Sequence, residues 1–226
     1  MPSSLQAPLK PPPGKRTTEW GSSPVVESVF DLLYSTLKSH RSLLDPSRVY
    51  IMGPSMGGLG AYMLAAKSPE TFAAAVPMCG GGKSLFGMLL KDGPPCWFFH
   101  SRDDVAVAVK DTESIVEAIT LAQREQGTQN ISGEPMSVAP RCTLYEHSPP
   151  PADPSCAWMD GHNCWDEAYS TPELWEWINV QKAPRWLKPF ENAKRAKPVE
   201  NVPTPSLGRP GRPGAGAPHL KPGHCS

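Results

Sequence analysis

The run Arg48-Val-Tyr-Ile-Met-Gly53-Pro-Ser55-Met-Gly57-Gly58 decides the fold class of this 226-residue chain. Three strand-forming residues, Val49 to Ile51, lead directly into a Gly-x-Ser-x-Gly pattern. The next stretch, Leu59 to Lys67, is rich in Ala and Leu and predicts a helix. A strand–turn–helix of this kind holds the serine on a tight turn with its hydroxyl clear of the backbone. We expect both flanking glycines to be required, because a Cβ would collide with neighbouring backbone there. The alternative is a simple glycine turn between a core strand and a core helix.

A serine hydroxyl is a weak nucleophile, so it needs a base, and a third group must orient that base. In folds with this turn, the acid follows the serine along the chain and the histidine comes last. Residues Pro95 to His100 predict a buried strand, and Asp103 and Asp104 follow it in a loop. His162 lies in a later loop, beyond the strand-like run Cys142 to Tyr145. This order makes Asp104 the candidate acid, with Asp103 as the alternative, and His162 the candidate base.

The other five histidines are weaker candidates for the base. His100 ends the strand just before the acid and is interpreted as structural. His40 ends a predicted helix, where a cationic residue suits the helix dipole. A weak alternative is His147, which lies beside a Pro-rich loop. The remaining two lie in a tail that predicts no fold, His219 and His224.

Two further segments predict amphipathic helices, Pro24 to His40 and Asp111 to Gln126. The first places five apolar residues on one side and the second places three. We expect these sides to face the core: Val25, Val29, Leu32, Leu33 and Leu37 in the first helix, and Ile115, Ile119 and Leu121 in the second.

Four blocks of residues lie in a characteristic order along the chain: 45–58, 72–82, 97–107 and 161–169, the last running into 172–177. Together they resemble the α/β-hydrolase superfamily. The resemblance is to the phospholipase/carboxylesterase and dienelactone-hydrolase-like group of esterases and predicted peptidases, and it covers the chain from about Trp20 to Trp186. It implies an α/β fold, a partial α/β-hydrolase with a mostly parallel sheet and flanking helices.

The resemblance also implies roles for particular residues. Ser55 matches the nucleophile, His162 the general base, and the backbone N–H of Met56 one oxyanion donor. The family's acid block, His-Gly-x-x-Asp-x-x-Val-Pro, aligns without a gap from His100 to Ala108 and places its aspartate at Asp104. A shift of the alignment by one residue would place it at Asp103 instead. The implied activity is hydrolysis of a small-molecule carboxylic ester through an acyl-enzyme. No cofactor and no metal are implied.

Nothing before Arg48 corresponds to the family's early strands or to the His-Gly loop that supplies a second oxyanion donor. We therefore expect a truncated fold with impaired activity. One rival hypothesis is a non-catalytic hydrolase relic or interaction module, and another is a serine peptidase of the prolyl-oligopeptidase type. By composition, residues 1–22 predict a disordered lead, 23–187 the partial hydrolase domain, and 188–226 a disordered Pro/Gly-rich tail.

Composition narrows the class of partner and the kind of site. Lys plus Arg and Asp plus Glu are both 22, so no basic surplus favours nucleic acid. No apolar run is long enough for a membrane span, and residues 1–20 lack a signal-peptide core. The cytoplasm is therefore the default expectation, with the compartment and the oligomeric state left open. The six cysteines lack the paired spacing of a zinc site, and a disulfide between Cys156 and Cys164 is considered but disfavoured.

Overall fold

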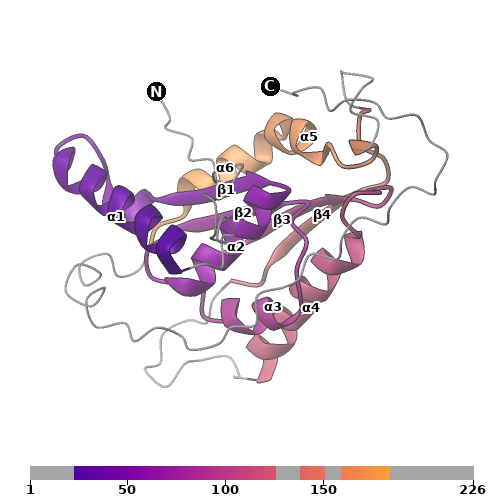
Figure 1. Ribbon diagram of the computed structural model, residues 1–226, viewed down its shortest axis with the longest axis horizontal. Coiled ribbons are helices and arrows are strands. Elements are labelled where there is room, and N and C mark those ends of the chain that lie inside the picture. Colours follow the sequence, from indigo (N-terminus) through magenta and orange to yellow (C-terminus); the bar gives the residue numbers. More distant parts are fainter. Residues whose placement is uncertain (1–22, 126–137, 151–158, 184–226) are drawn as a thin grey trace, which may run out of the picture.

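The computed structural model describes residues 23–125, 138–150 and 159–183, which form a parallel four-stranded sheet with helices on both faces (Figure 1). The expected lead, 1–22, and tail, 188–226, lie outside the described residues. In chain order the elements are α1 (Ser23–Ser39), the 3₁₀ helix η1 (Pro46–Arg48), β1 (Tyr50–Pro54), α2 (Met56–Lys67), β2 (Ala74–Met78), α3 (Leu85–Leu90), β3 (Trp97–Ser101), α4 (Val109–Glu125), β4 (Arg141–Tyr145), α5 (Cys164–Ser170) and α6 (Pro172–Val180).

The four strands lie in the sheet in chain order, β1-β2-β3-β4, and every pair is parallel. Tyr50 pairs with Ala74 at one end of the β1–β2 register, and Ser101 pairs with Tyr145 at the end of the β3–β4 register. Parallel strands need a crossover between them, which α2, α3 and α4 provide. The carboxyl ends of all four strands therefore meet at one edge, where the loops that follow them lie together. The predicted α/β class, a parallel sheet with flanking helices, is confirmed.

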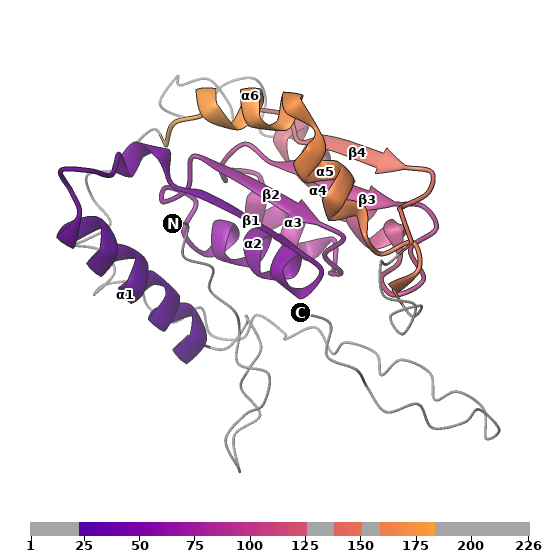
Figure 2. The same cartoon turned by 90° about the horizontal axis from the view of Figure 1, so that it is seen from above.

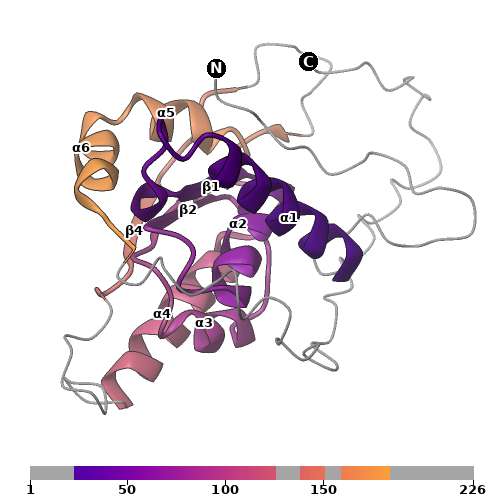
Figure 3. The same ribbon diagram turned by 90° about the vertical axis from the view of Figure 1, so that its left-hand side faces the viewer.

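The helices divide between the two faces of the sheet, with α1 to α4 on one face and α5 and α6 on the other (Figures 2 and 3). Side chains of β3 alternate between these layers because successive residues of a strand point to opposite faces. Phe98 joins the cluster under α2, α3 and α4, whereas Trp97 and Phe99 join the cluster under α5 and α6. The sheet is thus covered on both sides, as a parallel sheet requires.

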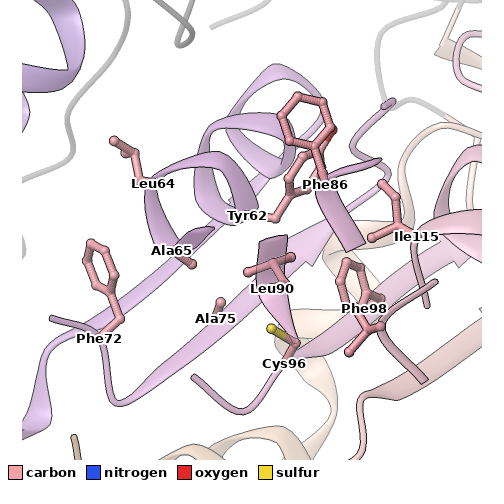
Figure 4. Close-up of a cluster of buried hydrophobic side chains, with 11 residues drawn as sticks. Tyr62, Leu64, Ala65, Phe72, Ala75, Phe86, Leu90, Cys96, Phe98 and Ile115 are labelled. Atoms are coloured by element: carbon pink, nitrogen blue, oxygen red, sulfur yellow. The ribbon is translucent and has the colours of Figure 1, made fainter. Parts of the chain in front are cut away.

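Aromatic and small side chains share the larger of the two cores (Figure 4). Ala65 and Ala75 allow α2 to lie close to β2, while Tyr62 and Phe86 pack with ring centroids 5.3 Å apart. Ile115 is fully buried against this cluster from α4. Removing large side chains from such a core typically costs about 2–5 kcal/mol of stability each. This core holds α2, and hence the turn that precedes it, rigidly against the sheet.

Two of the residues predicted to face the core are exposed instead. Leu32 in α1 is 46% exposed and Leu121 in α4 is 49% exposed. Leu121 lies two residues after the buried Ile119, which turns it about 200° around the helix axis. In α1 the packed apolar residues include Phe30 and Leu33, and Leu32 falls beside that stripe. None of the described helices has the length and apolar character needed to cross a membrane.

Candidate active site

Ser55 lies on the sharp turn between the last residue of β1 and the first residue of α2. Its backbone has φ 53° and ψ −120°, an uncommon conformation for a residue with a Cβ. Its N–H donates to the carbonyl of Met78, 2.9 Å away, and lies 3.3 Å from the sulfur of Cys79. The end of β2 thus fixes the turn, and strained backbone of this kind persists where the surroundings hold it in place.

The two glycines of the Gly-x-Ser-x-Gly pattern are not equivalent. A Cβ on Gly53 would lie 2.9 Å from the backbone of Gly57, so the first glycine is required by close approach. A Cβ on Gly57 would meet only the Cδ of Pro54, at 3.6 Å, which is an ordinary contact. The expectation that both glycines are sterically required is wrong for Gly57, because the turn is already complete where α2 begins.

A continuous chain of hydrogen bonds joins the three predicted site residues. The hydroxyl of Ser55 and the Nε2 of His162 are 2.8 Å apart, and the Nδ1 of His162 lies 2.6 Å from the Oδ2 of Asp104. A carboxylate accepts the Nδ1 proton, so Nε2 is left to accept from the serine. His162 is 2% exposed and the carboxylate is fully buried. The arrangement is able to take a proton from Ser55 and hold the resulting imidazolium.

The Asp104 carboxylate accepts hydrogen bonds on both oxygens. Its Oδ1 accepts from the backbone N–H groups of Ala106 and Val107, both at 2.8 Å, and its Oδ2 accepts from His162 and His100. Burial raises the pKa of this carboxyl, but the hydrogen bonds from His100, His162 and the Val107 N–H outweigh it and lower the pKa to about 2. Asp104 is therefore ionised at neutral pH.

Asp103, the alternative acid, points elsewhere. Its Oδ2 lies 3.2 Å from the Nδ1 of the exposed His147, and its Oδ1 accepts from the N–H of Ser148 at 3.3 Å. The structure therefore brings Asp104, and not Asp103, to His162. His147, the weak alternative base, pairs with Asp103.

His100 has a contact with the site that sequence reasoning did not anticipate. The residue is fully buried, and its Nε2 lies 3.0 Å from Asp104 Oδ2 and 3.1 Å from the carbonyl oxygen of Val107. Both partners are acceptors, so Nε2 carries a proton, and Nδ1 accepts from the hydroxyl of Thr112 at 2.7 Å. The structural interpretation of His100 thus extends to direct support of the carboxylate. The spacing of four residues between His100 and Asp104 was the available clue.

The loop that carries His162 packs directly on the loop that carries the acid. Gly161 has φ 69°, and a Cβ there would lie 2.1 Å from the carbonyl oxygen of Asp103. The indole of Trp165 contacts the His162 ring edge to face, with centroids 5.7 Å apart. Trp165 therefore packs directly on the candidate base.

Cys79 is a second feature that the sequence did not reveal. It follows β2, has φ 40°, and is fully buried beside the site. Interaction with the thiol of Cys164 and with His162 lowers the pKa of the Cys79 thiol, and the pKa of Cys164 is raised. Burial lowers the pKa of His162, but hydrogen bonds to Asp104 and Cys79 outweigh it and raise the pKa to about 9. The disulfide considered for Cys164 would involve Cys156, which lies outside the described residues.

Met56, the expected oxyanion donor, is the first residue of α2. A backbone N–H in the first turn of a helix has no partner within the helix, and the helix dipole favours negative charge there. Its side chain is 46% exposed, so it lies on the open side of the turn. A carbonyl oxygen that approaches Ser55 from solvent would reach this end of α2.

Known proteins match parts of this chain. A model of the prolyl oligopeptidase family matches residues 33–102, which is less than half of the chain. The poly(3-hydroxyalkanoate) depolymerase C of Paucimonas lemoignei is 36% identical over 69 residues, covering 30% of this chain and 16% of the depolymerase. A thermostable esterase of known structure is 28% identical with a TM-score of 0.56, covering 74% of this chain.

The chain spans 39% of the length of that esterase, so the match concerns one part of a larger hydrolase. The matched family model begins within α1 and ends just after β3, and therefore contains the Ser55 turn. Together with the parallel sheet and the strand–turn–helix around Ser55, these similarities make the chain a member of the α/β-hydrolase superfamily.

Proposed function

We propose that this chain carries the catalytic part of a serine hydrolase that cleaves carboxylic esters. The observation that supports this most directly is the hydrogen-bonded chain Ser55–His162–Asp104, with contacts of 2.8 Å and 2.6 Å. Ser55, Asp104 and His162 lie 49 and 58 positions apart along the chain, yet they meet with the order of donors and acceptors that acyl transfer needs. If the serine and the buried histidine met by chance, no ionised carboxylate would be expected to accept a hydrogen bond from the other ring nitrogen.

In the proposed mechanism His162 takes the proton of Ser55 while the hydroxyl oxygen attacks the ester carbonyl. Asp104 fixes the tautomer of the ring and stabilises the imidazolium that forms. The N–H of Met56 donates to the oxyanion, and the protonated His162 then gives its proton to the leaving alcohol. Water then enters, loses a proton to the same base and attacks the acyl carbon. His162 returns that proton to the Ser55 oxygen as the carboxylic acid leaves. Removing a single oxyanion donor typically lowers turnover by about 10²–10³-fold, so a site in which the Met56 N–H acted alone would turn over slowly.

A serine peptidase of the prolyl-oligopeptidase type is the second candidate, favoured by the family model that matches residues 33–102. The esterase is preferred because the match to the thermostable esterase covers 74% of the chain, whereas the family model covers residues 33–102 and ends before Asp104 and His162. Both reactions use the same three residues. The substrate class is therefore decided by comparing an ester with the corresponding amide.

The test begins with labelling of the purified chain by a fluorophosphonate, which reacts with activated serines. We expect Ser55→Ala to abolish labelling, while Ser84→Ala leaves it unchanged, since Ser84 is exposed and makes no capping hydrogen bond. Hydrolysis of p-nitrophenyl esters should then exceed that of the matching p-nitroanilides. Faster cleavage of the anilides would favour the peptidase. A folded chain with neither labelling nor hydrolysis would support the non-catalytic relic or interaction module.

A further inference from the structure

Three side chains that coordinate metals in other proteins converge beside Ser55. The sulfur of Cys79, a carboxylate oxygen of Asp104 and a ring nitrogen of His162 all lie within 4.8 Å of one another. Within the described residues this is the one group of three or more His, Cys, Asp or Glu side chains placed so closely. Each comes from a different loop at the carboxyl edge of the sheet, which is why no spacing along the sequence reveals the cluster.

We propose that Cys79, His162 and Asp104 form a binding site for a thiophilic divalent cation of the Zn²⁺ class, and that its binding blocks Ser55. The block rests on the proposed function, whereas the binding of the cation does not. The cation would act as an inhibitor and would take no part in the reaction.

The donor set fits such an ion. Thiolate, imidazole and carboxylate are the ligands Zn²⁺ takes in proteins, at about 2.0–2.3 Å, so ligand atoms in a tetrahedral shell lie about 3.3–3.8 Å apart. A pair of ligand atoms at the 4.8 Å limit would approach by about 1 Å to reach this spacing. If Nδ1 is the ligand, His162 Nδ1 and Asp104 Oδ2, now 2.6 Å apart, would separate by about 0.7 Å. The sulfur excludes hard ions such as Mg²⁺. Cys79 is the thiol that faces the cluster: its sulfur accepts from the N–H of Ser55 and also interacts with His162 and Cys164. The thiol of Cys164 points to the carbonyl oxygen of Phe99, 3.7 Å away.

Coordination by either ring nitrogen of His162 removes the base. A cation on Nδ1 forces the ring proton onto Nε2, which then faces the Ser55 hydroxyl as a donor and cannot accept its proton. A cation on Nε2 replaces the 2.8 Å contact with Ser55 outright. In both cases Cys79 releases its thiol proton to solvent and bonds through sulfur, and the ring contributes one lone pair. Ser55 is half-buried, so the cation approaches from its side of the cluster.

The first readout is Co²⁺ bound to the intact chain, because a thiolate ligand gives cobalt a charge-transfer band in the near ultraviolet. We expect a band that Zn²⁺ abolishes by competition and Mg²⁺ leaves unchanged. Cys79→Ser should abolish the band and weaken cobalt binding by ~10²-fold or more, since a hard hydroxyl replaces the sulfur. Cys142→Ala, which removes an exposed thiol on β4, is the matched control and should retain the band.

The second readout is fluorophosphonate labelling of Ser55 with and without Zn²⁺. We expect Zn²⁺ to suppress labelling, a chelator to restore it, and Cys79→Ser to require ~10²-fold more Zn²⁺ for the same suppression. If Cys79→Ser does not fold by circular dichroism, His162→Ala replaces it in the cobalt measurement and should weaken binding similarly. Ser55→Ala should keep the band.

The two readouts separate the two claims. A cobalt band that never forms, or that persists unchanged in the Cys79 and His162 variants, overturns the metal site. Labelling that Zn²⁺ never suppresses overturns the block of Ser55. A band lost in those variants, in a chain that neither labels nor hydrolyses esters, supports the metal site and overturns the proposed activity instead.

Discussion

Replacing Gly161 by alanine tests how the acid loop positions the histidine. Gly161 precedes His162, has φ 69°, and packs against the residues that carry the candidate acid. A Cβ at this position would lie 2.1 Å from the carbonyl oxygen of Asp103 and 2.7 Å from the N–H nitrogen of Asp104. Both obstacles are backbone atoms, so no side-chain rotation relieves the collision. The two loops must therefore move apart.

The size of the movement follows from the same distances. Real Cβ contacts essentially never fall below 3.0 Å, so the loops must separate by about 0.9 Å. The hydrogen bond between His162 Nδ1 and Asp104 Oδ2, now 2.6 Å, joins these two loops and would lengthen by a similar amount. A misplacement of about 1 Å in a catalytic group typically costs about 10²-fold in rate. The positive φ adds roughly 1–2 kcal/mol of strain for alanine.

The assay is kcat/KM for p-nitrophenyl ester hydrolysis, with the rate of fluorophosphonate labelling and Tm measured in parallel. Gly57→Ala is the matched control, because its Cβ meets only Pro54, at 3.6 Å, and alanine favours a helix by about 1 kcal/mol. We expect Gly161→Ala to lose about 10²-fold in kcat/KM. Gly57→Ala should stay near wild type. A Gly161→Ala variant within about threefold of wild type in kcat/KM, with unchanged Tm, would refute the reasoning.

Other predictions concern charge and protonation. Because the pKa of His162 is raised from 6.5 to about 9, kcat/KM should rise with pH up to about 9, and an acid limb near 6.5 would contradict this. Chemical denaturation should show the greatest stability between pH 3.8 and 6.5. The contribution of Asp104, whose pKa falls from 3.8 to about 2, is complete above pH 3.8 and is lost as the pH falls through about 2. The contribution of His162 is complete below pH 6.5 and is lost as the pH rises through about 9. Asp104→Asn should lower kcat by about 10⁴-fold and Asp103→Asn far less, and the reverse order would exchange their proposed roles. His100→Phe should lower the free energy of unfolding by about 2–4 kcal/mol, because the buried oxygens of Asp104 and Val107 lose their donor. It should lower kcat less than Asp104→Asn does. An unchanged free energy of unfolding would argue against the hydrogen bonds at His100.

Much of the fold could be predicted because the strands are short apolar runs followed by recognisable turns. The predicted strand at Pro95 to His100 corresponds to β3, Trp97–Ser101, all of whose residues are buried. Helix periodicity located α1 and α4 but misplaced single residues on them, since an amphipathic stripe has no sharp boundary. Leu121 is predicted to share a face with Ile115 and Ile119, but it lies two residues past Ile119 and is exposed. Periodicity locates an element more reliably than the residues at the margin of its buried face.

Most features of the site that could not be predicted from the sequence depend on contacts between loops. The order of Ser55, Asp104 and His162 along the chain was available from the topology, because loops at one edge of a parallel sheet meet. The choice between Asp103 and Asp104 depends on which carboxylate turns inward. That is decided by the N–H groups of Ala106 and Val107, which hold Asp104 from behind at 2.8 Å. A local backbone turn, invisible to periodicity, thus selects the residue that faces the histidine.

Cys79 shows why the remaining part of the site was out of reach. In a regular strand Cys79 would point to the face opposite Met78, because successive side chains alternate. Both residues instead join the cluster beneath α5 and α6, because the φ of 40° at Cys79 breaks the alternation at the end of β2. The same departure brings its sulfur to the N–H of Ser55, itself at φ 53°. Two adjoining turns therefore leave regular geometry together, and the thiol next to the candidate base is a consequence of the turn that presents the serine.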